Sequence, residues 1–185
     1  MTTEERERKE ILDAIIELEL DMFQRVRTSE PSACQERPEA FRAMRRMTHG
    51  VLSTETLESY LEDLKEAKAE ERNLLTEKYA RMQDLIPPLK FNPAIEDIVK
   101  IEARWTKELS QKYPHAFKGE PGFELYLHSE LETYSDRTLE LYFGDVSKAE
   151  GEGRNLAEEG YTMLFQEIGL GSIAEAEEKA KAASR

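Results

Sequence analysis

An all-α fold is predicted for this 185-residue chain by the spacing of its apolar residues, by its many helix-forming residues and by its sparse glycines and prolines. Apolar residues recur every three or four positions between the breaks, and no stretch alternates apolar and polar residues as a strand would. The nine glycines and seven prolines gather mainly in short segments that separate the helices. We therefore expect a single helical domain over residues 1–185.

The first half of the chain predicts three helices, over about 3–27, 38–48 and 53–85. An apolar stripe from Ile11 to Val26 defines the first helix. The second helix begins at Pro38, because proline suits the first turn. The third begins near Ser53, whose hydroxyl can cap a helix, and we expect it to be long because no glycine or proline interrupts it up to Leu85.

The second half predicts four more helices, over about 93–112, 123–134, 136–166 and 172–181. Pro93 starts the first of them, after a proline-rich link. We expect the long helix to bend at Gly151 and Gly153. Ser172 and Glu175 have the spacing of a capping box and start the last helix.

The chain contains an internal repeat. When residues 57–82 are placed over 139–164 without a gap, eleven of the 26 positions are identical. We assign repeat 1 to about 11–85 and repeat 2 to about 94–166, each with the order helix, short helix, long helix. The repeat predicts a bundle whose halves are related by a pseudo-twofold axis, with the long helices antiparallel and the short helices outside.

The residues that both repeats retain fall mostly on one face of the long helix. Tyr60, Ala67 and Leu74 form an apolar row, and Asp63, Glu70 and Glu77 form a carboxylate row beside it. We expect an acid-lined cleft between the two halves. The retained candidates for binding a ligand there are Tyr60, Tyr142, Arg72, Arg154, Asn73, Asn155, Glu77 and Glu159.

Glu19 and Glu102 are two further candidates, because each interrupts the apolar stripe of its helix. When this part of the alignment is shifted by one residue, Glu19 and Glu102 occupy the same position in the two repeats. A buried, unpaired carboxylate costs several kcal/mol or takes up a proton, so each requires a partner. That partner is an arginine, a metal ion, a ligand or the other carboxylate.

Internal salt bridges are one interpretation of these acids, since Arg72, Arg154 and the short helix that holds Arg42, Arg45 and Arg46 supply guanidinium groups. The other interpretation is a site for a small or cationic ligand. The two retained tyrosine pairs, Tyr60 with Tyr142 and Tyr79 with Tyr161, fit the packing of a core as well as the lining of such a pocket. A structural interaction module is a third hypothesis.

A magnesium- or manganese-dependent hydrolase is the enzymatic alternative. It would hold its ion with Glu19, Glu102, Glu77 and Glu159, because hard cations prefer oxygen ligands. A Glu-x-x-His pair of the kind found in helical di-iron proteins does not occur. Cys34 is the single cysteine, which excludes an intramolecular disulfide, and nothing fixes a catalytic base beside it.

The formal net charge of -13 argues against a nucleic acid as the main partner, because phosphates would be repelled. The charged first residues are unlike a signal peptide, and no apolar run is long enough to span a bilayer. The sequence therefore predicts a cytoplasmic protein that does not bind membranes.

Five segments in order resemble the bacterial and archaeal family called domain of unknown function 4125: "ELDMFQRV", "ACQ", "LESYLEDL", "RNLLTEKYARM" and "ELETYS". The family's Met-Phe-x-x-Val motif corresponds here to Met22, Phe23 and Val26. Its usual Gly-Arg-Asn-Leu is kept at Gly153, whereas Glu71 replaces the glycine in the first repeat. This departure favours a continuous helix there.

The resemblance implies no activity. Similar domains sometimes occur beside nucleotidyltransferase-like domains, so the resemblance makes such a protein an expected partner, with a regulatory role as the expectation.

Overall fold

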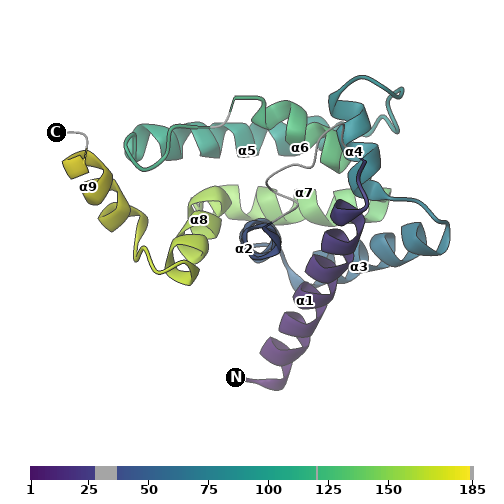
Figure 1. The fold of residues 1–185 in the computed structure, drawn as a ribbon, viewed down its shortest axis with the longest axis horizontal. Helices are drawn as coiled ribbons and strands as arrows, with labels where there is room; N and C mark the ends of the chain where they lie inside the picture. The colour runs from purple at the N-terminus through teal and green to yellow at the C-terminus, as the bar shows by residue number, and fades with distance from the viewer. Residues whose placement is uncertain (28–36, 120, 184–185) are drawn as a thin grey trace.

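The computed structural model describes residues 1–27, 37–119 and 121–183, and Cys34 lies outside them. Within these residues the chain is helical and contains no strand, as predicted. Figure 1 shows the helices: α1 (Thr3–Gln24), α2 (Pro38–His49), α3 (Thr54–Ala69), α4 (Leu74–Met82), α5 (Pro93–Lys112), α6 (Phe123–Leu131), α7 (Asp136–Gly151), α8 (Leu156–Glu167) and α9 (Ile173–Ala183).

The helices pack in matching pairs. In the first half α1 lies against α2, α3 and α4, and in the second half α5 lies against α6, α7 and α8. Figure 1 shows α5 and α7 side by side. The halves meet where α2 packs on α8, α4 packs on α6 and α3 packs on α7. The short helix of each half, α2 or α6, therefore packs against a helix of the other half.

The α3–α7 contact is tied at both ends by helix caps. Ser53 and Ser135 are the N-caps, and each hydroxyl accepts a hydrogen bond from the third residue of its helix. The Ser53 amide donates to Asp145 at 2.9 Å, and the Ser135 amide donates to Asp63 at 3.0 Å. Two members of the predicted carboxylate row are thus used for capping across the interface.

The predicted apolar row is buried in both halves, since Tyr60, Ala67 and Leu74 and their counterparts in α7 and α8 are at most 4% exposed. The short helices are not outside the bundle, which corrects the expectation from the repeat. α2 buries Arg45 and His49, and α6 buries Leu127 and Glu130. Because these polar side chains are buried in the core, each of them requires a hydrogen-bond or ion-pair partner.

Two expected long helices are each broken into two. The continuous helix expected over 53–85 was wrong, whereas the break in the helix expected over 136–166 falls at Gly151 and Gly153, where a bend was predicted. α3 ends at Ala69 and the chain restarts as α4, because Glu71 adopts a left-handed conformation with φ 58°. The Arg72 amide then donates to the Ala67 carbonyl at 2.8 Å, which closes a Schellman motif. The same break separates α7 from α8, where Gly153 has φ 70°. Glu71 therefore takes the conformation of the glycine it replaces.

The remaining helix boundaries lie close to the predictions. The first helix ends at Gln24 instead of Arg27, and α6 ends at Leu131 instead of Tyr134. The other boundaries differ by no more than a few residues. Across the described part of the chain, no helix is both long enough and apolar enough to cross a membrane.

Replacing Glu71 with glycine is expected to stabilise the protein by about 0.5–1 kcal/mol, because glycine adopts a positive φ without the steric cost that other residues incur. The midpoint of urea unfolding measures this effect. Glu71→Ala is the matched control, since alanine keeps the cost, and no gain is expected. An equal gain for both variants would show that the Glu71 side chain, and not its backbone, is unfavourable.

Candidate functional site

Arg45 occupies the centre of a buried ionic network between the halves. Its side chain is 4% exposed, although it belongs to the short helix α2. The guanidinium donates to both oxygens of Glu19, at 2.8 and 2.5 Å. It also donates to both oxygens of Glu130, at 3.1 and 2.7 Å. Two bidentate pairs fix the position of α2 relative to α1 and α6.

Glu19 is fully buried and fully partnered. Besides Arg45, Tyr60 donates to its carboxylate at 2.7 Å, and His49 Nε2 lies 3.1 Å from both carboxylate oxygens. Burial alone would raise the pKa of Glu19, but the charge of Arg45 and the contact with His49 lower it to about 2. Glu19 is therefore ionised at neutral pH.

Glu130 shares Arg45 with Glu19 and has a second cation of its own. Lys78 is 1% exposed and donates to Glu130 at 2.5 Å. Its ammonium also lies 3.4 Å from the ring centre of Tyr126. Burial raises the pKa of Glu130, and the charges of Arg45 and Lys78 more than offset this effect, so the pKa lies well below its usual range. Two cations thus balance two carboxylates.

Glu102 is not bound by either of these two cations, Arg45 and Lys78. Tyr142 donates to its carboxyl at 2.6 Å, as Tyr60 does to Glu19. Within the described residues no cation pairs with Glu102. Burial raises its pKa to about 7, against a smaller lowering by the Tyr142 hydrogen bond, and the charge of Glu130 adds to the rise. At neutral pH the carboxyl lies close to its titration point.

The repeat identifies what Glu102 lacks. The alignment of α2 with α6 places Leu127 at the position of Arg45 and Leu131 at that of His49. Glu102 therefore has leucines where Glu19 has its two nitrogen-containing partners. The second half retains the carboxyl and its tyrosine but not the cation.

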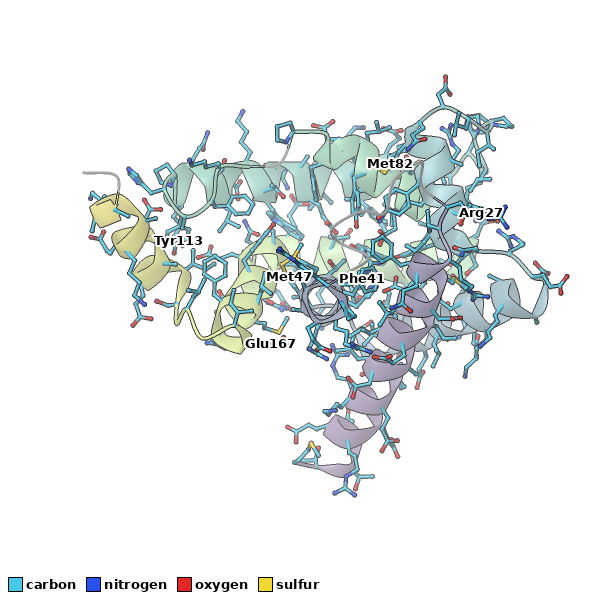
Figure 2. The ribbon with its side chains drawn as sticks, in the orientation of Figure 1. Arg27, Phe41, Met47, Met82, Tyr113 and Glu167 are labelled. Carbon is cyan, nitrogen blue, oxygen red and sulfur yellow. The ribbon has the colours of Figure 1, made fainter. Side chains whose placement is uncertain are left out.

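A cavity of about 240 Å³ lies beside Glu102, between α2, α5, α6, α7 and α8. Aromatic and aliphatic side chains form most of its wall, and Arg45 and Glu130 reach it from the buried network. Figure 2 shows Met47 on the side of α2 toward α8, and Phe41 on the side toward α1. The aromatic residues of the wall are Phe123, Tyr126, Tyr142 and Tyr161.

Gly160 allows α8 to approach α2 at the edge of this cavity. A Cβ atom at this position would lie 2.8 Å from the Met47 carbonyl oxygen, so any side chain would push the helices apart. In the first repeat the corresponding residue is Lys78. In the second repeat Met47 of α2 takes up the space around this position, which the lysine side chain begins to fill in the first repeat.

The structure divides the predicted site residues into two groups. Glu19 with Tyr60 and Glu102 with Tyr142 lie in the centre of the protein. The other six lie at the two helix breaks, where Arg72 binds Glu77 and Arg154 binds Glu159, each through two hydrogen bonds. Asn73 and Asn155 cap α4 and α8.

The four carboxylates predicted to hold magnesium or manganese are not gathered into one site, because Glu77 and Glu159 are bound to arginines at the two helix breaks. Among the described residues, the group whose atoms lie close enough together for one ion is Glu19, His49 and Glu130. Arg45 contacts all three. A guanidinium already provides the positive charge that an ion would supply there.

Sequence reasoning named Arg45 only as one of three arginines on a short helix, and it missed Lys78 and Gly160. The repeat did contain a signal for both, because position 78 of the first copy and position 160 of the second hold lysine and glycine. Residues that both copies share do not include these two positions. The cavity lies where the copies differ.

Residues 9–178 match the sequence model of a family described as protein of unknown function (DUF4125). No curated protein and no solved structure matches the chain.

Proposed function

This chain belongs to the DUF4125 family, and we propose that it binds a small organic cation in the cavity beside Glu102. One observation carries the proposal: Glu102 contributes a carboxyl to the cavity wall, and none of the described residues supplies it with a cation. Glu19, at the same position of the first repeat, receives Arg45. A bound cation would pair with Glu102 in the second half as Arg45 pairs with Glu19 in the first.

An organic cation fits this cavity better than a metal ion. Magnesium and manganese take about six oxygen ligands in octahedral geometry, and magnesium is usually held by one or two free carboxylates together with waters and the phosphates of a substrate. The other carboxylate in the wall, Glu130, is already bound by Arg45 and Lys78. An ammonium group needs one carboxylate and gains further from aromatic faces, and both are present here.

The apolar walls make the interaction with Glu102 strong enough to select a ligand. A charge pair that is removed from water is stabilised more than a pair on the surface, provided that each charge keeps its partner. The burial that raises the pKa of Glu102 also lowers the local dielectric constant around a bound cation. Pockets that combine apolar walls with few polar groups are typical of small-molecule sites.

We expect the purified protein to bind simple ammonium ions such as n-butylammonium, measured by changes in its amide NMR spectrum. Glu102→Gln should weaken binding at pH 8 at least tenfold, since the amide keeps the shape of the carboxyl but loses its charge. Glu77→Gln is the matched control, because Glu77 lies in an ion pair at a helix break, and its affinity should equal that of the wild type.

Two results would refute the proposal. One is the failure of every ammonium ion to bind at millimolar concentrations. The other is equal affinity of the wild type and Glu102→Gln, which would place the ligand elsewhere.

A further inference from the structure

We infer that the ligand is a primary amine that carries an aromatic ring. This inference rests on the proposed function and adds the chemical class of the ligand to it. The reason is that the first repeat fills with its own side chains the space that corresponds to the cavity in the second repeat. Those side chains indicate what shape the space accepts, and Glu102 indicates what charge it accepts.

The equivalence of the two repeats rests on contacts as well as on the alignment. Asn73 donates to the Met22 carbonyl at 2.8 Å, and Asn155 donates to the Trp105 carbonyl at 3.1 Å. With the alignment of the asparagines, these bonds place Met22 at the position of Trp105. The next residues along the two helices, Phe23 and Thr106, are therefore equivalent too.

Two positions in the cavity wall hold smaller residues than their counterparts in the first repeat and are not filled by a close neighbour. They are Thr106 in place of Phe23 and Ala157 in place of Leu75. Both differences remove volume from the second half. A bound molecule of matching shape would restore it.

In the first repeat this volume holds an aromatic ring. The ring of Phe23 stacks on Phe41, with 4.7 Å between the ring centres and 13° between the planes. Tyr79 lies on a second side, 6.3 Å from Phe23 between ring centres.

The counterparts of the residues around Phe23 are present in the cavity wall. Phe123 replaces Phe41 and Tyr161 replaces Tyr79, but Thr106 supplies no ring between them. An aromatic ring of the ligand would stack there, which is worth more than the same area of aliphatic contact. The wall thus favours an aromatic ligand over an alkyl ammonium of equal size.

The charged end of the ligand is assigned to Glu102. One carboxyl oxygen, Oε1, already accepts from Tyr142 at 2.6 Å, which leaves the other oxygen for the ligand. A compact ammonium can bond to one oxygen, whereas a guanidinium binds best to both. A quaternary ammonium has no hydrogen to donate. A primary ammonium is therefore the group that suits this position.

The test compares 2-phenylethylammonium with n-butylammonium, which lacks the ring, and with 2-phenylethanol, which lacks the charge. Isothermal titration at pH 8 should give 2-phenylethylammonium an affinity at least tenfold above that of either of the others. Thr106→Phe places the ring of the first repeat in the cavity and should abolish this advantage. Glu77→Gln, at a helix break away from the cavity, should keep it.

Ala157→Leu provides a second way to fill the cavity, should Thr106→Phe fail to fold, and its thermal unfolding reports whether the helix packing is intact. It should also lower the affinity for 2-phenylethylammonium at least tenfold. If the two ammonium ions bind equally and both depend on Glu102, the inference about the ring is wrong while the proposed function stands. If neither ion binds, both fail.

Discussion

Replacing Arg45 with leucine is expected to destabilise the protein by about 3–5 kcal/mol. Leucine is the residue that the second repeat carries at this position, so the helix itself tolerates it. The loss arises because Glu19 and Glu130 are both buried and both depend on the guanidinium. Lys78 remains with Glu130, but Glu19 loses the guanidinium that binds both of its oxygens. Urea unfolding at pH 7 measures the change.

The pH dependence of this loss has a defined sign. The pKa of Glu19 lies at about 2 in the folded wild type, below its usual value of 4.5, so its pairing stabilises the protein above pH 4.5. That stability disappears as the pH falls toward 2. In the Arg45→Leu variant the buried carboxyls take up protons more readily, and the deficit should therefore shrink as the pH is lowered from 7 to 4.5.

Arg42→Leu serves as the control for removal of a positive charge from the same helix. Arg42 binds Glu17 and Glu39 at the surface, where an ion pair contributes little because water solvates both groups. A loss of stability in Arg45→Leu no larger than in Arg42→Leu would show that the network around Arg45 is not what holds α2 in place.

The sequence was sufficient to predict the helices, because helix formation depends on local spacing and on local caps. Ser53, Pro38 and Pro93 all begin helices where their chemistry suggested. The break at Glu71 was missed for a physical reason. Its left-handed conformation is opposed by local preference and is held by contacts distant in sequence, such as the Asn73 bond to the Met22 carbonyl.

The relation of the halves by a pseudo-twofold axis stays a prediction, which the paired contacts favour. The bonds from Tyr60 to Glu19 and from Tyr142 to Glu102 occupy matching positions. So do the ion pairs that Arg72 and Arg154 form at the helix breaks. Identical residues in the two copies thus mark the shared architecture.

The candidate site could be predicted only in part. Sequence reasoning expected a partner for each of Glu19 and Glu102, and the salt-bridge interpretation is right for Glu19. It could not show that α2 crosses to the other half, because the position of a short helix depends on tertiary packing. Nor could it show that Arg45 binds Glu19 and Glu130 together, so that none of the described residues gives Glu102 a cation.

Glu102→Gln is expected to raise the stability of the protein at pH 8 by about 1–3 kcal/mol and to change it little at pH 5. The pKa of Glu102 is raised by burial to about 7 in the folded state, from a usual value of 4.5. Between these values the folded protein holds a proton that the unfolded chain has released. The contribution of Glu102 to the free energy of unfolding of the wild type therefore falls as the pH rises from 4.5 to 7. A glutamine stays neutral over this range and avoids that loss.

Urea unfolding of both proteins at pH 5 and pH 8 measures the difference. Glu19→Gln is the control at the equivalent position, and it should destabilise the protein at both pH values, since Glu19 is ionised and paired throughout. A Glu102→Gln variant that is less stable than the wild type at pH 8 would mean that the carboxylate has a cation among the protein's own residues, and the basis for a cationic ligand would be lost.

The expected gain also bears on function. A partly buried acid that lowers stability at neutral pH is of the kind found at functional sites, where binding or catalysis requires an unfavourable group. In the first repeat the carboxylate at the equivalent position, Glu19, is paired with Arg45. If Glu102→Gln is both more stable and unable to bind ammonium ions, the carboxyl weakens the free protein and is needed for the bound one. Saturating ligand should then stabilise the wild type but not the variant.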